Sequence, residues 1–183
     1  MQEAVVGFDP DAAGEQPAAA LEALISRVEE EVRKLQLIRF SQEDALSLGL
    51  LIVELATERE LPVAVDIRRG NHVLFHVSLP GATADNDAWV ERKARTAERY
   101  AAPSLLVGLR GRVSGGRIED NAWFDQAVYA AHGGAFPVQV KGIGPVAIAT
   151  VSGLPQMEDH DLVVEALTKF SRRKKKVAPA ASR

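Results

Sequence analysis

The chain has 183 residues, 46% of them hydrophobic and 26% charged, which is ordinary for a globular domain with its own core. It contains no cysteine, which excludes disulfides, iron–sulfur clusters, cysteine-ligated zinc and thiol nucleophiles, and suits a reducing compartment such as the cytoplasm. The net charge is −3 although residues 172–176 form a basic run, so the rest of the chain is more acidic than this total. We therefore expect no nucleic-acid partner, and no membrane partner because the most apolar window, residues 45–56, is too short for a span.

The composition along the chain predicts three parts. Residues 1–17 combine glycine and proline with small and acidic residues, which indicates a flexible leader. Residues 18–171 form a single domain, and residues 172–183 form a basic flexible tail. An electrostatic docking function for this tail is the alternative.

The first half of the domain predicts two helices and a hairpin. From Ala18 onward apolar residues recur every three or four positions, which predicts an amphipathic helix. Ser41 can cap a second helix, and because residues 45–56 are apolar nearly all round, we expect other elements to cover this helix on several sides. Residues 63–68 and 73–77 then alternate as two strands around a tight turn at Gly70-Asn71.

The second half predicts a helix over residues 85–100, ended by Pro103. Residues 105–109 fit either a strand or a short helix, and residues 121–131 are predicted to be helical. A second hairpin follows at residues 136–140 and 146–151, and a last helix at residues 158–170. Hairpins separated by helices predict an α+β domain with an antiparallel sheet, and the sequence carries no glycine-rich phosphate-binding motif of a doubly wound fold.

The histidines and carboxylates leave several alternatives open. His132 precedes Gly133 and Gly134, so it either ends a helix or lies at the rim of a pocket to which the backbone comes close. No histidine pair has the spacing of a zinc site, so no metal is expected. Metal-dependent hydrolysis is one alternative function. It requires four side chains to converge around an ion: Asp85, Asp87, Asp159 and His160.

One side of the helix over residues 85–100 carries an aromatic and cationic stripe. Trp89 and Lys93 lie on this side, with Arg92 at its flank. Such a stripe can bind a flat anionic ligand or a partner subunit, and more often it packs in a core or an interface.

Three motifs in order resemble one known family. They are the Asp85-Asn86-Asp87-x-Trp89 segment, the His132-Gly133-Gly134 segment, and the segment G-P-V-A-I-A-T-V-S-G-L-P-Q-M-E-D-H-D that ends at Asp161. Together they resemble the haem-degrading-domain family, also called GlcG/HbpS-like, over about residues 40–170. The resemblance is closest to its uncharacterised branch.

The resemblance implies a five-stranded antiparallel sheet flanked by helices, in a profilin- or PAS-like arrangement. It also implies a homo-oligomer built from dimers, and haem or another planar anionic molecule as a ligand, although no cofactor is required. The sequence therefore favours a ligand-binding protein over an enzyme, and a non-enzymatic scaffold is the alternative. No residue is assigned a catalytic role. The residues expected to line a ligand site are Asp85, Asn86, Trp89, Arg92, Lys93, His132, Gly133, Gly134 and His160.

Overall fold

The computed structural model describes residues 17–177, and the leader expected at residues 1–17 lies almost entirely outside them, as does the end of the expected tail. The helices are α1 (Ala18–Lys34), α2 (Gln42–Glu58), α3 (Ala84–Tyr100), α4 (Ser104–Val113), the 3-10 turn η1 (Ile118–Asp120) and α5 (Gln156–Val177). The strands are β1 (Gln36–Leu37), β2 (Ala64–Arg69), β3 (His72–Ser78), β4 (Ala135–Val140) and β5 (Gly144–Ser152).

The strands form one sheet in the order β1-β4-β5-β2-β3. Both expected hairpins are present, β2 with β3 and β4 with β5, and β5 joins them through antiparallel pairing with β2. The α+β class with five strands is therefore confirmed. The sheet is mixed rather than wholly antiparallel, because the two-residue β1 pairs parallel to β4.

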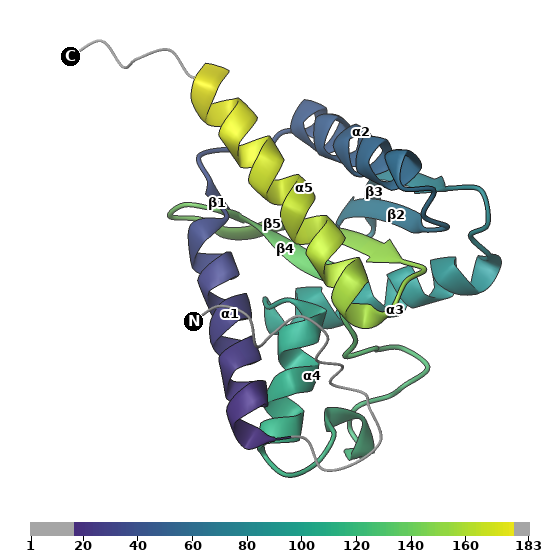
Figure 1. Cartoon of the computed structure of the whole chain (residues 1–183), viewed down its shortest axis with the longest axis vertical. Coiled ribbons are helices and arrows are strands. Elements are labelled where there is room, and N and C mark those ends of the chain that lie inside the picture. The colour runs from purple at the N-terminus through teal and green to yellow at the C-terminus, as the bar shows by residue number, and fades with distance from the viewer. Residues whose placement is uncertain (1–16, 178–183) are drawn as a thin grey trace.

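Helices cover both faces of the sheet (Figure 1). α2 and α5 pack on one face around a core that includes Ile52, Val65 and Leu167, all nearly inaccessible to solvent. α3 crosses the opposite face against β2, β4 and β5. α1 and α4 pack on each other around a second cluster that includes Leu24 and Leu105.

The start of α2 follows the capping signal in the sequence. The backbone N–H of Asp44 donates to Ser41 Oγ at 3.2 Å, and the backbone N–H of Ser41 donates to Asp44 Oδ2 at 2.9 Å. This reciprocal pair satisfies two amides that the helix leaves without partners. α2 packs against α5, β2 and β3, as expected of a helix covered on several sides, but one side stays open, since Leu46 is 51% exposed and Leu50 is 54% exposed.

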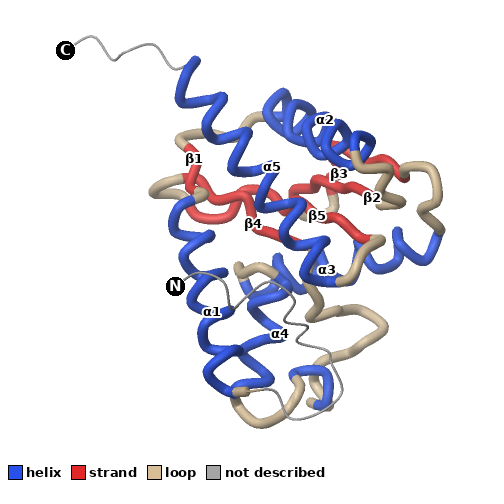
Figure 2. Tube along the Cα trace, viewed as in Figure 1, coloured by secondary structure: helices blue, strands red, loops and turns tan. Residues whose placement is uncertain are grey.

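The segment before β4 corrects a second expectation. Residues 121–131 are not helical; they form turns after η1, drawn as a long loop in Figure 2. Their backbone is held by α3 instead, because the Ala130 N–H donates to the Arg92 carbonyl at 3.2 Å and to Thr96 Oγ1 at 3.0 Å. With no helix before it, His132 does not end a helix, and that alternative is wrong. Residues 104–113, which include the stretch left open between strand and helix, form α4.

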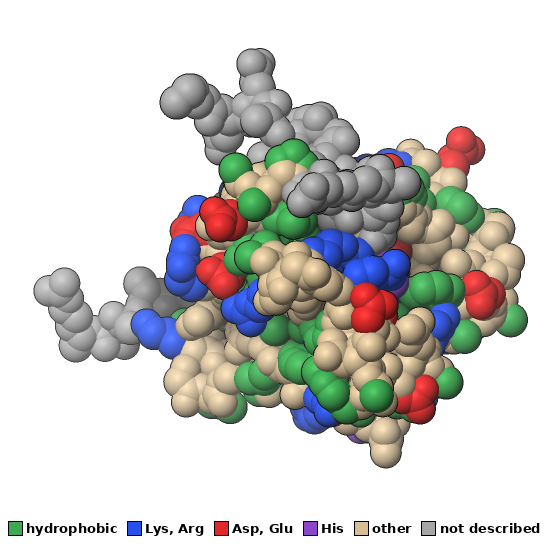
Figure 3. All heavy atoms as spheres, turned by 90° about the horizontal axis from the view of Figure 1, so that it is seen from below, with side chains coloured by type: hydrophobic (Ala, Val, Ile, Leu, Met, Phe, Trp, Pro, Cys, Tyr) green, Lys and Arg blue, Asp and Glu red, His purple; other side chains and the backbone are tan. Residues whose placement is uncertain are grey.

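The last helix continues past Phe170 to Val177 and contains the whole basic run, residues 172–176, which was expected to belong to the tail. Lys174 forms an ion pair with the carboxylate of Asp44, and Arg173 lies 3.8 Å from Glu54, so this part of the run lies along α2. Figure 3 shows another face, on which side chains of both charge signs are interspersed outside the grey atoms. No helix of the described residues is long and apolar enough to cross a membrane.

Candidate functional site

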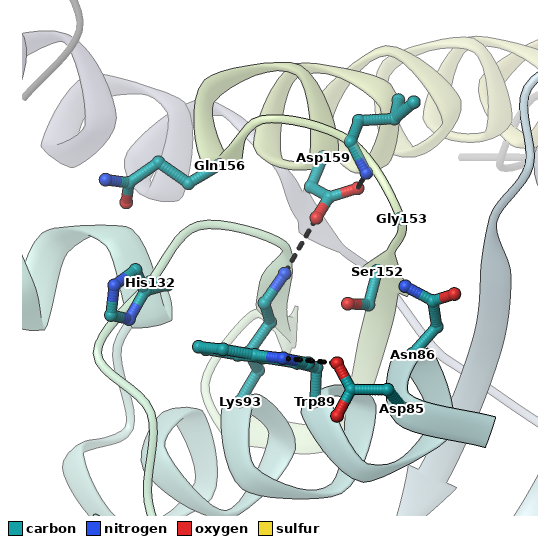
Figure 4. Close-up of a pocket in the computed structure, with 10 residues that line it drawn as sticks. Asp85, Asn86, Trp89, Lys93, His132, Ser152, Gly153, Gln156 and Asp159 are labelled. Carbon is teal, nitrogen blue, oxygen red and sulfur yellow. Dashed lines mark hydrogen bonds and ion pairs between the residues drawn. The ribbon is translucent and has the colours of Figure 1, made fainter. Parts of the chain in front are cut away.

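A cavity of about 250 Å³ lies between the first half of α3, the turn at His132 and the turn that leads from β5 into α5 (Figure 4). Five of the nine residues expected to line a site border it, and three segments distant in the sequence meet there. The residues lining it are Asp85, Asn86, Trp89, Lys93, His132, Ser152, Gly153, Leu154, Gln156 and Asp159.

The wall of this cavity contains a buried ion pair. Lys93 is 3% exposed and Asp159 is fully buried, and Lys93 Nζ lies 2.7 Å from Asp159 Oδ2. The backbone N–H of Leu154 also donates to Asp159 Oδ1, at 3.1 Å. Burial raises the pKa of Asp159 to about 6, against the opposing effect of Lys93, and burial lowers the pKa of Lys93. Perturbed groups of this kind beside a cavity mark a candidate functional site.

Trp89 forms the aromatic side of the cavity and is held from three directions. Its indole Nε1–H donates to Asp85 Oδ2 at 3.1 Å, and its ring meets His132 edge-on with centroids 5.3 Å apart. The guanidinium of Arg92 lies 4.0 Å from the ring centroid. Arg92 does not line the cavity; its Nη1 reaches the Gln126 carbonyl at 3.4 Å, so it supports Trp89 and anchors the loop.

The turn that carries His132 is fixed by α4. Ser104 Oγ donates to the His132 carbonyl, and the Ala135 N–H donates to Ser104 Oγ at 3.1 Å. The imidazole Nδ1 lies 3.8 Å from Glu119 Oε1, and the Glu119 side chain is 6% exposed. This distance is too long for a direct hydrogen bond, and Glu119 was missed because no sequence pattern connects it to His132.

The two glycines support the site without lining it. A Cβ on Gly133 would lie 2.0 Å from the Gln156 carbonyl oxygen. A Cβ on Gly134 would lie 2.3 Å from the Val151 carbonyl oxygen and 2.9 Å from Lys93 Nζ, and its φ of 127° also favours glycine. The absence of side chains at these two glycines therefore lets their backbone lie close to β5, α5 and Lys93.

His160 lies outside the cavity. Its side chain is 1% exposed, and Nε2 lies 2.9 Å from Glu31 Oε2, so it connects α5 to α1. The four residues of the metal-hydrolysis alternative do not converge either, since Asp87 accepts from Ser78 Oγ on β3 while Asp159 pairs with Lys93. Among the described residues, no group of three or more histidine or carboxylate side chains could hold a metal ion.

Asn86 caps its own helix and also faces the cavity. Its Oδ1 accepts from the backbone N–H of Thr83 at 2.7 Å, which directs the amide nitrogen toward Ser152 (Figure 4). The cavity thus offers an amide, a hydroxyl and an ammonium as donors. Ser152, Gln156 and the pairing of Asp159 were not expected from the sequence.

Comparison with known proteins gives consistent matches. Residues 40–168 match the family described as haem degrading protein HbpS-like. A UPF0303 protein of Streptomyces coelicolor is 55% identical over 146 residues, which cover 80% of this chain and 92% of that protein. The crystal structure of the Ybr137w protein has a TM-score of 0.75 at 33% identity and covers 84% of this chain and 91% of that one. The PduOC:heme complex has a TM-score of 0.62 at 20% identity, covers 72% of this chain and 94% of that one, and shows a common fold.

Proposed function

Since the chain belongs to the HbpS-like family of haem degrading proteins, we propose that it binds one small molecule in the Trp89 cavity, the cavity lined by Trp89, Lys93 and His132. The observation that carries this proposal is the buried Lys93–Asp159 pair at the cavity wall. An ion pair removed from water is costly, and packed apolar side chains would hold α3 to α5 at lower cost. Because this ion pair borders an open cavity, we infer that it contributes to binding a ligand.

The size and the donors of the cavity define the class of ligand. A volume of about 250 Å³ is below the roughly 300–1,000 Å³ of sites for drug-sized ligands. Asn86, Ser152 and Lys93 present donors, which suit a carboxylate or carbonyl oxygen, and Trp89 presents an aromatic surface. We propose a small carboxylic acid as the ligand.

Haem is the second candidate, and the family name together with the haem complex of a structural neighbour favours it. The residues of the Trp89 cavity do not fit an enclosed haem. The volume is too small to enclose the macrocycle, and His160 is turned away toward Glu31, which leaves His132 as the imidazole at the cavity. A haem bound here would therefore extend out of the Trp89 cavity.

Trp89 supplies a direct binding assay. The chain has 2 tryptophans, so Trp123→Phe leaves Trp89 as the sole reporter. Titration with small carboxylic acids, pyruvate included, should give saturable quenching that Lys93→Met abolishes and Lys141→Met, at an exposed turn position, preserves. If no acid changes the fluorescence, or if both lysine variants respond equally, the proposed function is wrong. In parallel, a saturable Soret shift with hemin that His132→Ala removes would favour haem.

We also propose that the protein is a homo-oligomer of the reducing cytoplasm. Leu46 and Leu50 expose an apolar strip on α2, and β3 beside it is an edge strand whose Val73 is 47% exposed. Exposed apolar strips next to an unpaired edge favour association. The absence of cysteine suits a reducing compartment. If the protein is instead a non-enzymatic scaffold, it would also self-associate, but it would bind no ligand in the Trp89 cavity.

A further inference from the structure

Lys93 is placed as a reactive amine would be. Its Nζ lies at the centre of the residues that line the Trp89 cavity, between the Trp89 and His132 rings on one side and Ser152 on the other (Figure 4). The side chain is 4% exposed, so bulk water hardly reaches it. Asp159 Oδ2, at 2.7 Å, is its charged partner, and the Val151 carbonyl at 3.4 Å is its other acceptor.

The environment favours the neutral amine that attack on a carbonyl requires. Burial lowers the pKa of Lys93, and the nearby charge of Arg92 acts in the same direction. Burial also raises the pKa of Asp159 to about 6, so this carboxylate can accept the proton that the ammonium releases. A desolvated lysine beside a proton acceptor is one way in which proteins prepare a lysine to form imines.

We propose that Lys93 forms an imine with a small α-keto acid bound in the Trp89 cavity. This inference rests on the proposed function and names the substrate class of the same site. The ammonium passes one proton to Asp159, and the amine nitrogen attacks the carbonyl carbon to give a carbinolamine. The nitrogen gives a second proton to the former carbonyl oxygen. Asp159 then returns its proton to the departing hydroxyl, so one water leaves and a protonated imine remains.

The other groups of the cavity suit the rest of such a ligand. The Asn86 amide and the Ser152 hydroxyl lie on the side of Lys93 opposite His132, where they can hold the carboxylate of the keto acid (Figure 4). His132, whose Nδ1 lies 3.8 Å from Glu119 Oε1, stands on the other side of Lys93 (Figure 4). An imidazole at this place can donate to or accept from an oxygen of the ligand.

Borohydride trapping tests the inference in the full-length protein. Wild-type protein is incubated with pyruvate, reduced with sodium borohydride, and digested for peptide mass spectrometry. We expect the reduced adduct on Lys93 at tenfold or higher occupancy than on Lys141, an exposed lysine in the same digest. Lys93→Arg keeps the charge but cannot form the imine, so it should show no adduct at this position. Asp159→Asn should reduce trapping, because it removes the proton acceptor.

The result that overturns the inference is the absence of an adduct on Lys93, or equal labelling of Lys93 and Lys141. Since the comparison is made within wild-type protein, it does not depend on the folding of any variant. Quenching of Trp89 by pyruvate, measured without borohydride, separates the two proposals. If pyruvate binds and no adduct forms, only the imine fails. If pyruvate does not bind, the imine fails and the proposed function loses this acid as a ligand.

Discussion

The ammonium of Lys93 on α3 and the carboxylate of Asp159 on α5 lie 2.7 Å apart, both buried, at the wall of the Trp89 cavity. The pair connects the helix on one face of the sheet to the first turn of the helix on the other face. The ligand site and the packing of the domain therefore depend on the same two side chains, and variants at either position must be tested for stability and for binding separately.

The Asp159 carboxyl predicts a pH dependence of stability. Its ordinary pKa is 3.8 and burial raises it to about 6 in the folded state, so the folded protein binds this proton more tightly than the unfolded chain. Its contribution is fully present below the unfolded pKa and is lost as the pH rises through about 6. The unfolding free energy of wild type minus that of Asp159→Asn should therefore increase by about 1 kcal/mol between about pH 7 and pH 5. Urea unfolding at both pH values measures it, and a difference that shrinks on acidification would contradict the assignment.

Gly134→Ala should destabilise the domain strongly. The new methyl would meet the Val151 carbonyl and Lys93 Nζ, and the φ of 127° is unfavourable for alanine. We expect a loss of about 3 kcal/mol in unfolding free energy. The control is Gly142→Ala, which also has a positive φ, 79°, but has open space around its Cβ and should cost about 1 kcal/mol. If both variants lost a similar amount of unfolding free energy, the contacts of Gly134 with the Val151 carbonyl and Lys93 would not restrict this position.

His160→Ala should cost stability and leave binding intact. The ring fills buried space and pairs with Glu31, whose pKa stays below its ordinary value because His160 and Arg27 outweigh the effect of burial. Removal should lower the unfolding free energy by about 2–4 kcal/mol. His132→Ala, at the cavity, should change ligand affinity more than stability. Thermal unfolding and Trp89 titration of both variants separate the stability role of His160 from the binding role of His132. If His160→Ala lost ligand binding and His132→Ala kept it, these assignments would be wrong.

Leu50→Glu should break the proposed association. A charge in an apolar strip that a second copy covers would lose its water on assembly, which is costly. Light scattering after size exclusion should show wild type larger than one chain and the variant smaller than wild type. Ile143→Glu, in the β4–β5 turn at a residue that is 75% exposed, is the control and should keep the wild-type mass. A monomeric wild type, or an unchanged mass for Leu50→Glu, would contradict the proposal.

The sequence predicted those parts of the fold that local rules decide. The capping signal at Ser41, the Gly70-Asn71 turn and the alternation of the hairpin strands act between near neighbours, and each was confirmed. The two-residue β1 was missed because only pairing with the distant β4 makes it a strand. Residues 121–131 were wrongly predicted to be helical because α3, through the Arg92 carbonyl and Thr96, takes the Ala130 N–H that a helix would use.

The candidate site divides in the same way. The spacing of Trp89 and Lys93 on one helix predicted that these side chains share a side, and the structure brings both to one cavity. The partners that give them their chemistry are distant in sequence. Asp159 meets Lys93 only because β5 and α5 return to α3, and Glu119 meets His132 only through the loop around η1. Periodicity within an element carries no information on such pairs.

Native mass spectrometry of the protein purified from its own cells tests the central claim most directly, because it reports a bound small molecule and the number of subunits together. The claim that the Trp89 cavity holds a small acid predicts a bound mass on the wild type, one per chain at saturation. That mass should be lost in Lys93→Met and retained in Lys141→Met. A wild type that carries no small molecule, or one whose bound mass survives unchanged in Lys93→Met, would contradict it.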